Sequence, residues 1–320
     1  MPGIFLFMQQ TKDWSKFLLW CSSIQTVLTY PKTHLPLNKN QEAKLIALID
    51  KPDRSPKEES DMLKYIGKQA AVDNAPLSKM AINYMIRRYG WEKYAKKTAA
   101  KGNQFAFYEK GTLLEGEAIE LMSRLDRVRY KHNNQIITND YLLGKCDILS
   151  PERKTIIDLK VSWNISTFMA ALNGPLKAMY WYQMQGYLEL YDLDFGEVCF
   201  CLLNTPVDLV EREKVRLLNK YVFGEINRED YEKKMESLEL SLTYNNIPLK
   251  RRVIRFRVNR YPDLMPKIQR KVERCREWLT NFEALHTFGG EIITLPEHYA
   301  HTKENNTQLD PDESCEVDEG

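Results

Sequence analysis

Residues 144–162 read GKCDILSPERKTIIDLKVS and contain two short apolar runs separated by a polar, turn-forming segment. Asp147 lies in the first run, and Asp158 lies in the second with Lys160 two positions further on. Acidic residues are depleted in β-strands, and charged groups are usually excluded from the protein interior. Two acids and a lysine within strand-like sequence therefore indicate a function for this stretch.

The segment SPERK has the length of a hairpin turn, so 141–149 and 155–162 are expected to pair as antiparallel strands. If the turn closes between its glutamate and its arginine, Asp147 lies nearly opposite Asp158. Two carboxylates about 5 Å apart repel by roughly 3 kcal/mol at an effective dielectric constant of about 20. A divalent cation between them would convert this repulsion into binding energy.

The two-residue period of a strand places Asp158 and Lys160 on one face. The other face, directed to the core, holds Ile157, Leu159 and Val161. Carboxylate oxygens suit Mg²⁺ or Mn²⁺, which lower the pKa of a bound water and stabilise charge on an attacked phosphate. Lys160 would position the water, and partial burial is expected to lower its pKa. The stretch indicates a metal-dependent phosphodiesterase centre.

A simpler interpretation is that both acids are strand-edge residues paired with Lys145, Arg153 or Lys160, because an acid, a gap and acid-x-Lys arise readily by chance. The surrounding elements favour the catalytic interpretation. Apolar residues recur at helical spacing in 111–128, and a second helix is expected at 175–192. Strands are expected at 133–140, 141–149, 155–162 and 195–204, which gives the order helix, three-strand meander, helix, strand.

These residues resemble the PD-(D/E)xK nuclease superfamily, and within it the branch of phage lambda exonuclease and the YqaJ-like recombinases, with the RecB nuclease domain more distant. In that branch the first helix carries a glycine, an acid four residues on and an alanine three further. The chain has Gly111, Glu115 and Ala118. Glu115 is therefore the candidate for the third metal-site acid, with Glu117 next and Glu120 after it. An acid near a helix N-terminus is otherwise favoured by the helix dipole.

Relatives of this kind also carry Gln-xxx-Tyr on the helix after the lysine strand. Gln183 and Tyr187 match it, and their spacing places both on one helical face. Taken singly, such residues are more often hydrogen-bonded or packed without a catalytic role. The usual proline before the first motif acid is absent, since Cys146 precedes Asp147. The Leu159 carbonyl is expected to be a further metal ligand.

The resemblance also suggests residues that contact substrate. Ser22 and Ser23 belong to a segment that lies beside the substrate in relatives, although capping a helix is the commoner role for serine there. Ser162, directly after the lysine strand, is a further candidate. The stretch 248–262 carries six basic residues and no acid between Lys250 and Arg260. Its arginines either contact phosphates or form a solvated edge that resists strand pairing.

The implied fold is α/β (α+β), with a central mixed sheet in α-β-β-β-α-β order and flanking helices. A helical N-terminal lobe (1–105), a nuclease core (106–210), a C-terminal extension (211–300) and an acidic, disordered tail (301–320) are expected. The implied activity is Mg²⁺- or Mn²⁺-dependent exonuclease action on duplex DNA ends in recombination, with one or two ions. A single-strand annealing protein and a ring-shaped homo-oligomer are the implied partners.

Composition agrees with a polyanion-binding protein. The 320 residues carry a net charge of +2, but the last twenty hold seven acids and one lysine, so residues 1–300 carry +8. The opening apolar run is too short for a signal peptide or a membrane span, which predicts a cytoplasmic protein. The six cysteines show no CxxC pair, so neither a disulfide framework nor an iron–sulfur cluster is indicated.

Two alternative functions share the expected fold. A sequence-specific endonuclease would have the same core, but it would usually lack the Gln-xxx-Tyr helix. A catalytically silent DNA-binding or assembly protein would keep the fold without the chemistry. Retention of three acids and a lysine argues against this second alternative, because unused clustered carboxylates destabilise a protein.

Overall fold

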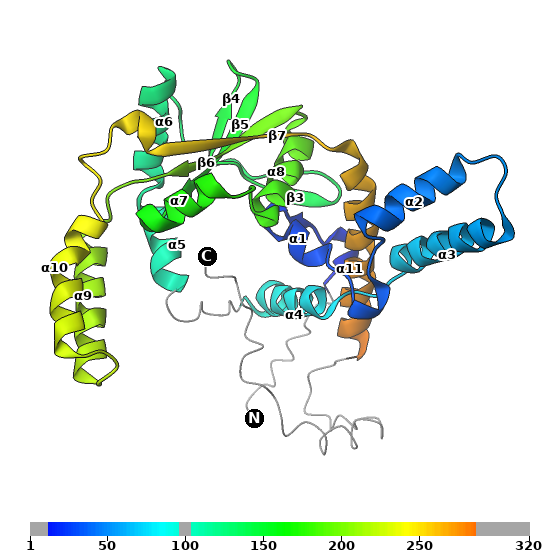
Figure 1. Cartoon of the computed structure of the whole chain (residues 1–320), viewed down its shortest axis with the longest axis horizontal. Helices are drawn as coiled ribbons and strands as arrows, with labels where there is room; N and C mark the ends of the chain where they lie inside the picture. Colours follow the sequence, from blue (N-terminus) through cyan, green and yellow to red (C-terminus); the bar gives the residue numbers. More distant parts are fainter. Residues whose placement is uncertain (1–11, 96–103, 286–320) are drawn as a thin grey trace, which may run out of the picture.

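The structure is a computed structural model that describes residues 12–95 and 104–285. The expected acidic tail at 301–320 and the apolar run at the start lie outside these ranges. Figure 1 shows a sheet covered by helices, with a helical hairpin projecting at each end. The helices are α1 (Ile24–Val27), α2 (Lys39–Ile49), α3 (Pro56–Asp73), α4 (Lys79–Tyr94), α5 (Gln104–Leu113), α6 (Glu115–Asp126), α7 (Ile165–Asn173), α8 (Ala178–Tyr191), α9 (Val207–Val222), α10 (Arg228–Ser241) and α11 (Met265–Leu285). Short 3-10 helices are η1 (Trp14–Lys16), η2 (Cys21–Ser23), η3 (Lys32–His34), η4 (Leu249–Arg251) and η5 (Pro262–Leu264).

The larger sheet has four strands in the order β4-β5-β6-β7. They are β4 (Ile148–Ser150), β5 (Thr155–Val161), β6 (Phe195–Cys201) and β7 (Val253–Asn259). β4 and β7 are antiparallel to their neighbours, whereas β5 and β6 are parallel. A parallel pair needs a crossover connection, and α7 and α8 supply it between β5 and β6. The expected α/β fold with a mixed sheet is confirmed.

The expected meander does not form one sheet. The run 141–149 divides into β3 (Leu142–Gly144) and β4, and β3 pairs with β2 (Ile137–Thr138) and β1 (Leu19–Trp20) in a separate sheet. Between β3 and β4, Asn133 binds the main chain. Its side-chain amide donates to the Cys146 carbonyl, and its backbone N–H donates to the Asp147 carbonyl. The two carbonyls between β3 and β4 thus bond to Asn133 rather than to a strand.

The two faces of the larger sheet have different cores. Ile156 packs with Met184 and Leu188 of α8, whereas Ile157 and Leu159 pack with the apolar residues of α6. The alternation follows from the two-residue period of a strand, so Asp158 and Lys160 share the α8 face. This arrangement confirms the expected faces of β5. It also places the charged pair of the strand against the helix that carries Gln-xxx-Tyr.

The helix expected at 111–128 is interrupted at Leu114, whose φ of −100° and ψ of 6° separate α5 from α6. Glu115 is consequently the first residue of α6, where the helix dipole favours an acid. Ala118 and Leu121 are buried on the expected face. The break fixes the motif acid at the start of a helix, beside the sheet.

The basic strand at 248–262 forms β7, the edge of the sheet. Its arginines are used within the protein: Arg255 pairs with Asp126 and Glu197, and Arg260 pairs with Glu189. Arg255 and Arg260 are therefore held by internal ion pairs, so neither the phosphate-contact role nor the solvated-edge role expected for the strand describes them. In the ranges 12–95 and 104–285, no helix is long and apolar enough to cross a membrane. The domain limits expected from the sequence stay a prediction.

Candidate active site

The two motif aspartates lie opposite each other. β4 pairs with β5 in a register that matches Ile148 with Ile157 and Ser150 with Thr155. One step further along the same register, Asp147 faces Asp158, as the expected hairpin requires. The Asp147 Oδ2 accepts a hydrogen bond from the Leu159 N–H at 2.6 Å. A residue's N–H and C=O point to the same edge of its strand, so the Leu159 carbonyl is directed to the side of Asp147.

Asp147 is held in an environment that opposes its negative charge. Burial is the largest cause, and the Asp158 carboxylate adds repulsion; together they raise the Asp147 pKa to about 7. The Leu159 N–H and Lys160 act in the opposite direction, while Glu115 adds further repulsion. All three predicted acids therefore act electrostatically on one position. A buried carboxylate among like charges is an unstable arrangement unless a cation joins it.

Lys160 provides such a cation to Asp158. The Lys160 Nζ lies 2.8 Å from the Asp158 Oδ2, and the aspartate side chain is almost wholly buried. The ammonium also lies 5.0 Å from the centre of the Tyr180 ring. Burial acts to lower the Lys160 pKa, but the Asp158 charge and hydrogen bond outweigh it, so the pKa is raised. The expected downward shift is wrong for this arrangement, because the lysine is paired with an acid.

Gln183 and Tyr187 extend this chain of polar groups along α8. The Lys160 Nζ lies 3.5 Å from the Gln183 Oε1, and the Gln183 Nε2 donates to the Tyr187 hydroxyl at 2.8 Å. The second bond confirms that both side chains lie on one helical face. Burial raises the pKa of Tyr187 well above its ordinary value, so the hydroxyl stays neutral. Gln183 thereby connects the lysine to a fixed, buried phenol.

The three candidates for the third metal-site acid differ in the exposure of their side chains. Glu115 is partly buried, and its Oε1 lies 2.8 Å from the His132 Nε2. Glu117 is exposed, and Glu120 is exposed and paired with Arg124 on the outer helix face. Because Glu115 is partly buried and its charge adds repulsion at Asp147, it is the best placed of the three acids.

Ser162 lies at the end of β5, where the site opens into a cavity. Lys160 and Ser162 line this hollow of about 520 Å³ together with Tyr180, Phe200 and Phe256. The Ser162 N–H donates to the Cys201 carbonyl at 2.9 Å, which anchors the residue to β6. The aromatic floor and polar rim suit a ligand that has both an apolar ring and a charged group.

The oxygen donors of the site are of the kind that binds a divalent cation. Carboxylates of Asp147 and Asp158, the Leu159 carbonyl and Glu115 are hard oxygen donors of the kind that Mg²⁺ and Mn²⁺ prefer. The raised pKa of Asp147 is the electrostatic sign that a positive charge would be stabilised here. Within the described ranges, no three side chains of His, Cys, Asp or Glu already converge on one ion position. Lys160 and His132 instead occupy two of the carboxylates, so the donors fit once these ion pairs open.

Solved structures with a similar fold were found for this chain. A phage-related exonuclease from Haemophilus somnus 129PT matches 85% of this chain and 97% of its own length, with a TM-score of 0.56 and 23% identity. The chain has this exonuclease fold. An alkaline exonuclease from Laribacter hongkongensis matches 86% of the chain and 96% of its own, with a TM-score of 0.47 and 13% identity. No protein-family model and no curated protein sequence matches the chain. The expected resemblance is thus confirmed at the level of the fold.

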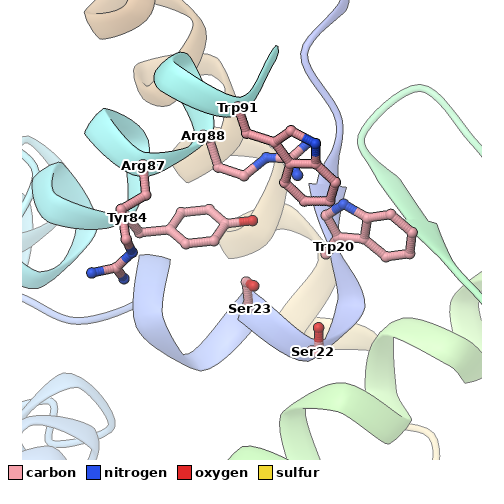
Figure 2. A pocket seen from close by; sticks show the side chains of 7 residues that line it. All are labelled: Trp20, Ser22, Ser23, Tyr84, Arg87, Arg88 and Trp91. Carbon is pink, nitrogen blue, oxygen red and sulfur yellow. The ribbon is translucent and has the colours of Figure 1, made fainter. Parts of the chain in front are cut away.

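Ser22 and Ser23 lie elsewhere in the exonuclease fold, in a second cavity. Ser23 occupies the N-cap position of α1, yet its side chain makes no capping hydrogen bond. The commoner role for such a serine is therefore not the one observed. Both hydroxyls line a hollow of about 400 Å³ together with residues of α4, as Figure 2 shows. The structure does not bring them into contact with the aspartates.

Two further residues of the candidate site are not marked by the sequence motifs. His132 pairs with Glu115, and Tyr180 lies below the Lys160 ammonium. No motif marks the histidine, which lies in the loop after α6. Tyr180 could have been found, because it precedes Gln183 by three residues and so shares its helix face. Both contact a motif residue that is distant in the sequence, which only the folded chain makes evident.

Proposed function

We propose that the chain is a Mg²⁺-dependent exonuclease that hydrolyses phosphodiester bonds at the ends of duplex DNA. The main support is a series of polar contacts that runs from Asp158 through Lys160 and Gln183 to Tyr187. Asp147 lies opposite Asp158 on the neighbouring strand. Each of these residues matches a sequence motif to which a chemical role is assigned above. The fold of a phage-related exonuclease supports the assignment.

In this proposal Asp147, Asp158, Glu115 and the Leu159 carbonyl hold one or two Mg²⁺ or Mn²⁺ ions. The bound ions supply an activated water and stabilise charge on the phosphate. Asp147 has to ionise, which its pKa of about 7 permits from neutral pH upward. Glu115 leaves its pair with His132 to join the site.

The protein residues orient the reaction. With a metal ion held at Asp158, the Lys160 ammonium would be available to orient the attacking water and the phosphate oxygens. Gln183 lies 3.5 Å from the same ammonium and limits how far it moves. Ser162 at the rim of the cavity donates to a phosphate oxygen. The aromatic floor formed by Phe200 and Phe256 lies against the nucleotide that is released.

Cleavage of an end-labelled linear duplex with Mg²⁺ tests the proposal. We expect wild-type protein to release nucleotides, and Asp158→Asn and Lys160→Met to lower the rate at least about 100-fold, because each removes a group that acts on the reacting phosphate. Glu236→Gln, an exposed acid of α10, is the matched control and keeps the wild-type rate. Thermal unfolding in Ca²⁺ provides a second readout, since Asp158→Asn should lose the ion-dependent increase in melting temperature.

The outcomes separate the alternatives. Cleavage of an end-blocked circular duplex would assign an endonuclease instead. DNA binding without any release of nucleotides, in Mg²⁺ and in Mn²⁺, would assign a silent binding protein. If Asp158→Asn and Lys160→Met both kept the wild-type rate, the candidate site would have no part in the reaction.

The implied partners are part of the proposal. Apolar side chains are exposed on α9 (Val215, Leu218, Val222) at one end of the molecule and on the α2–α3 hairpin (Ile46, Leu63, Ile66) at the other. A contact between different faces of identical copies closes into a ring when its rotation permits. We therefore place the ring-shaped homo-oligomer on these two hairpins. A single-strand annealing protein as partner follows from the resemblance, and the cytoplasm remains the proposed location.

Val222→Glu tests the ring. We expect this variant to elute as a monomer, at a mass of about the single chain, where wild-type protein elutes as an oligomer measured by light scattering. Glu236→Gln again serves as the control. A monomeric wild-type protein at micromolar concentration would remove the ring from the proposal and leave the exonuclease assignment untouched.

A further inference from the structure

A lysine of α11 is buried with its charged end unbonded. Lys271 is 5% exposed, and its Nζ forms no hydrogen bond with any residue that the structure describes. The ammonium lies 4.4 Å from the centre of the Tyr30 ring, and this cation–π contact offsets only part of the cost of removing the charge from water. An apolar side chain of similar length would fill the same space without that cost. The buried amine therefore indicates a site for an anion.

Further cations of the same helix lie around this amine. The small hollow at Lys271 is lined by Tyr30, by Val72 of α3, and by Lys267, Arg270, Lys271 and Arg274 of α11. The four α11 residues are spaced at i, i+3, i+4 and i+7, so they share one helical face, and like charges at this spacing repel each other. Among the described residues, no acidic side chain lines the hollow. A bound anion would relieve the repulsion between these cations.

Contacts between α11 and the N-terminal elements hold the hollow in place. α11 packs against α1 and α4 (Figure 1), and Tyr30 follows α1 in the chain. The Arg274 guanidinium donates to the carbonyl of Ala75, just beyond α3. Burial and, after it, the nearby Arg274 charge lower the pKa of Lys271. This is the direction expected for an amine whose desolvation is not balanced by a paired acid.

The size and charge of the hollow select its ligand. The volume of about 10 Å³ holds about one water-sized group, so the hollow cannot enclose a base or a sugar. Lys267 and Arg270 line the hollow and are exposed, which places them at its rim. A phosphate matches this arrangement, because one oxygen can reach the Lys271 ammonium while the others stay beside the rim cations. A chloride ion is a single atom and would leave the rim cations without a contact.

We propose that this hollow, the Lys271 site, binds a phosphate group, one oxygen of which accepts a hydrogen bond from the buried ammonium. Free inorganic phosphate and the backbone of a DNA strand present the same chemistry to the site, and the experiment below distinguishes these two sources. The inference does not depend on the proposed cleavage at Asp158 and Lys160, because neither residue lines the Lys271 site.

Thermal unfolding in EDTA, with sodium phosphate compared against sodium chloride at equal ionic strength, tests the site without metal or cleavage. We expect phosphate to raise the melting temperature of wild-type protein by about 2–4 °C at ten times the dissociation constant. Lys271→Met should lose this rise. Without phosphate it should melt at least as high as wild type, because a buried, unbonded charge has been removed. An equal rise with chloride, or an equal rise in wild type and Lys271→Met, would overturn the proposal.

Three further lysine variants support the assignment. Lys267→Met keeps the test decisive if Lys271→Met does not fold, because Lys267 is exposed; we expect it to weaken phosphate binding about 2- to 5-fold. Lys233→Met, at an exposed position of α10, is the matched control and should bind phosphate like wild type. Lys160→Met should also keep the phosphate effect. Loss of the effect in Lys160→Met would place the anion at the cleavage site and overturn the Lys271 site.

Anisotropy of a labelled DNA duplex in EDTA distinguishes the two sources of the phosphate. If the group belongs to a strand, Lys271→Met weakens duplex binding by roughly 10- to 100-fold, the effect of one charge-assisted hydrogen bond, and lowers the salt dependence of binding by about one charge. If the ligand is the free ion, Lys271→Met binds the duplex like wild type, while the phosphate-dependent rise in melting temperature stays specific to wild type. A wild-type protein that shows the phosphate effect but releases no nucleotides would refute only the proposed cleavage.

Discussion

The folded surroundings of Glu115 and Glu117 distinguish these two candidates for the third acid. Glu115 and Glu117 are two positions apart in the first turn of α6, and the sequence motif alone leaves both in consideration. In the fold, Glu115 lies 2.8 Å from His132 and acts on Asp147, whereas Glu117 is exposed. A helix turns by about 100° per residue, so these two acids lie about 200° apart and cannot both face the site.

Substitution of these glutamates distinguishes their roles. We expect Glu115→Gln to lower the nuclease rate at least about 100-fold, because it removes a charged ligand, and Glu117→Gln to change it less than about threefold. The measurement is release of label from a linear duplex at saturating Mg²⁺. The reverse order of effects would transfer the third-acid role to Glu117.

Lys110 is a buried cation outside the proposed chemistry. It is 1% exposed, its Nζ donates to the Trp163 carbonyl at 2.6 Å, and burial lowers its pKa to about 8. The unfolded chain binds this proton up to a pH of about 10.5, so between about 8 and 10.5 the unfolded state holds more protons. Stability contributed by this site therefore rises with pH in that window.

Lys110→Met should remove this dependence. Between pH 7.5 and 9.5, we expect the free energy of unfolding of wild-type protein to rise by about 2 kcal/mol relative to the variant. Urea unfolding at the two pH values measures it, and the comparison cancels the titration of tyrosines, which is common to both proteins. Parallel pH profiles would show that the amine keeps its ordinary pKa.

At the scale of elements, an ion-pair network joins α6 to the sheet. Asp126 at the end of α6 accepts from Arg255 of β7 at 2.6 Å and from Arg153 at 2.9 Å. Glu197 of β6 accepts from the same two arginines, at 3.2 Å from Arg255 and 2.7 Å from Arg153. Although burial opposes it, the hydrogen bonds from Arg255 and from Tyr130 lower the Asp126 pKa. The network engages Arg255 within the protein, whereas the sequence left open a phosphate contact or a solvated edge for the basic strand.

Arg255→Met should destabilise the protein by about 2 kcal/mol, because two partly buried acids lose a shared partner. Arg257→Met is the matched control on the same strand: its guanidinium lies over the Phe195 ring and forms no ion pair with any residue that the structure describes, so we expect less than about 1 kcal/mol. Wild-type stability also falls as pH decreases through the lowered Asp126 pKa, and the variant should lose less of it. Equal effects of the two substitutions would contradict the network.

For the whole molecule, close packing at Gly186 fixes the N-terminal segment on the core. A Cβ there would lie 2.6 Å from the Ile24 side chain and 2.7 Å from the Cys21 sulfur. Ile24 and Cys21 are both buried and have little room to move. The segment 19–28 is thereby joined to the helix of Gln183 and Tyr187.

We expect Gly186→Ala to destabilise the protein by about 1–3 kcal/mol through this overlap. Gly116→Ala in α6 is the control, because nothing lies within 4 Å of its added methyl group, and it should stabilise by about 0.5–1 kcal/mol through helix propensity. Thermal and urea unfolding measure both. A stabilising Gly186→Ala would show that the N-terminal segment is displaced easily.

The sequence by itself determined the features that depend on local order. The strand period placed Asp158 and Lys160 on one face, a turn closing between Glu152 and Arg153 set Asp147 opposite Asp158, and helical spacing aligned Gln183 with Tyr187. Only the tertiary structure decided the division of 141–149 between two sheets, the pairing of Glu115 with His132, the rise in the Lys160 pKa and the internal use of Arg255. These depend on contacts between segments distant in the chain, whose burial and charge no local pattern records.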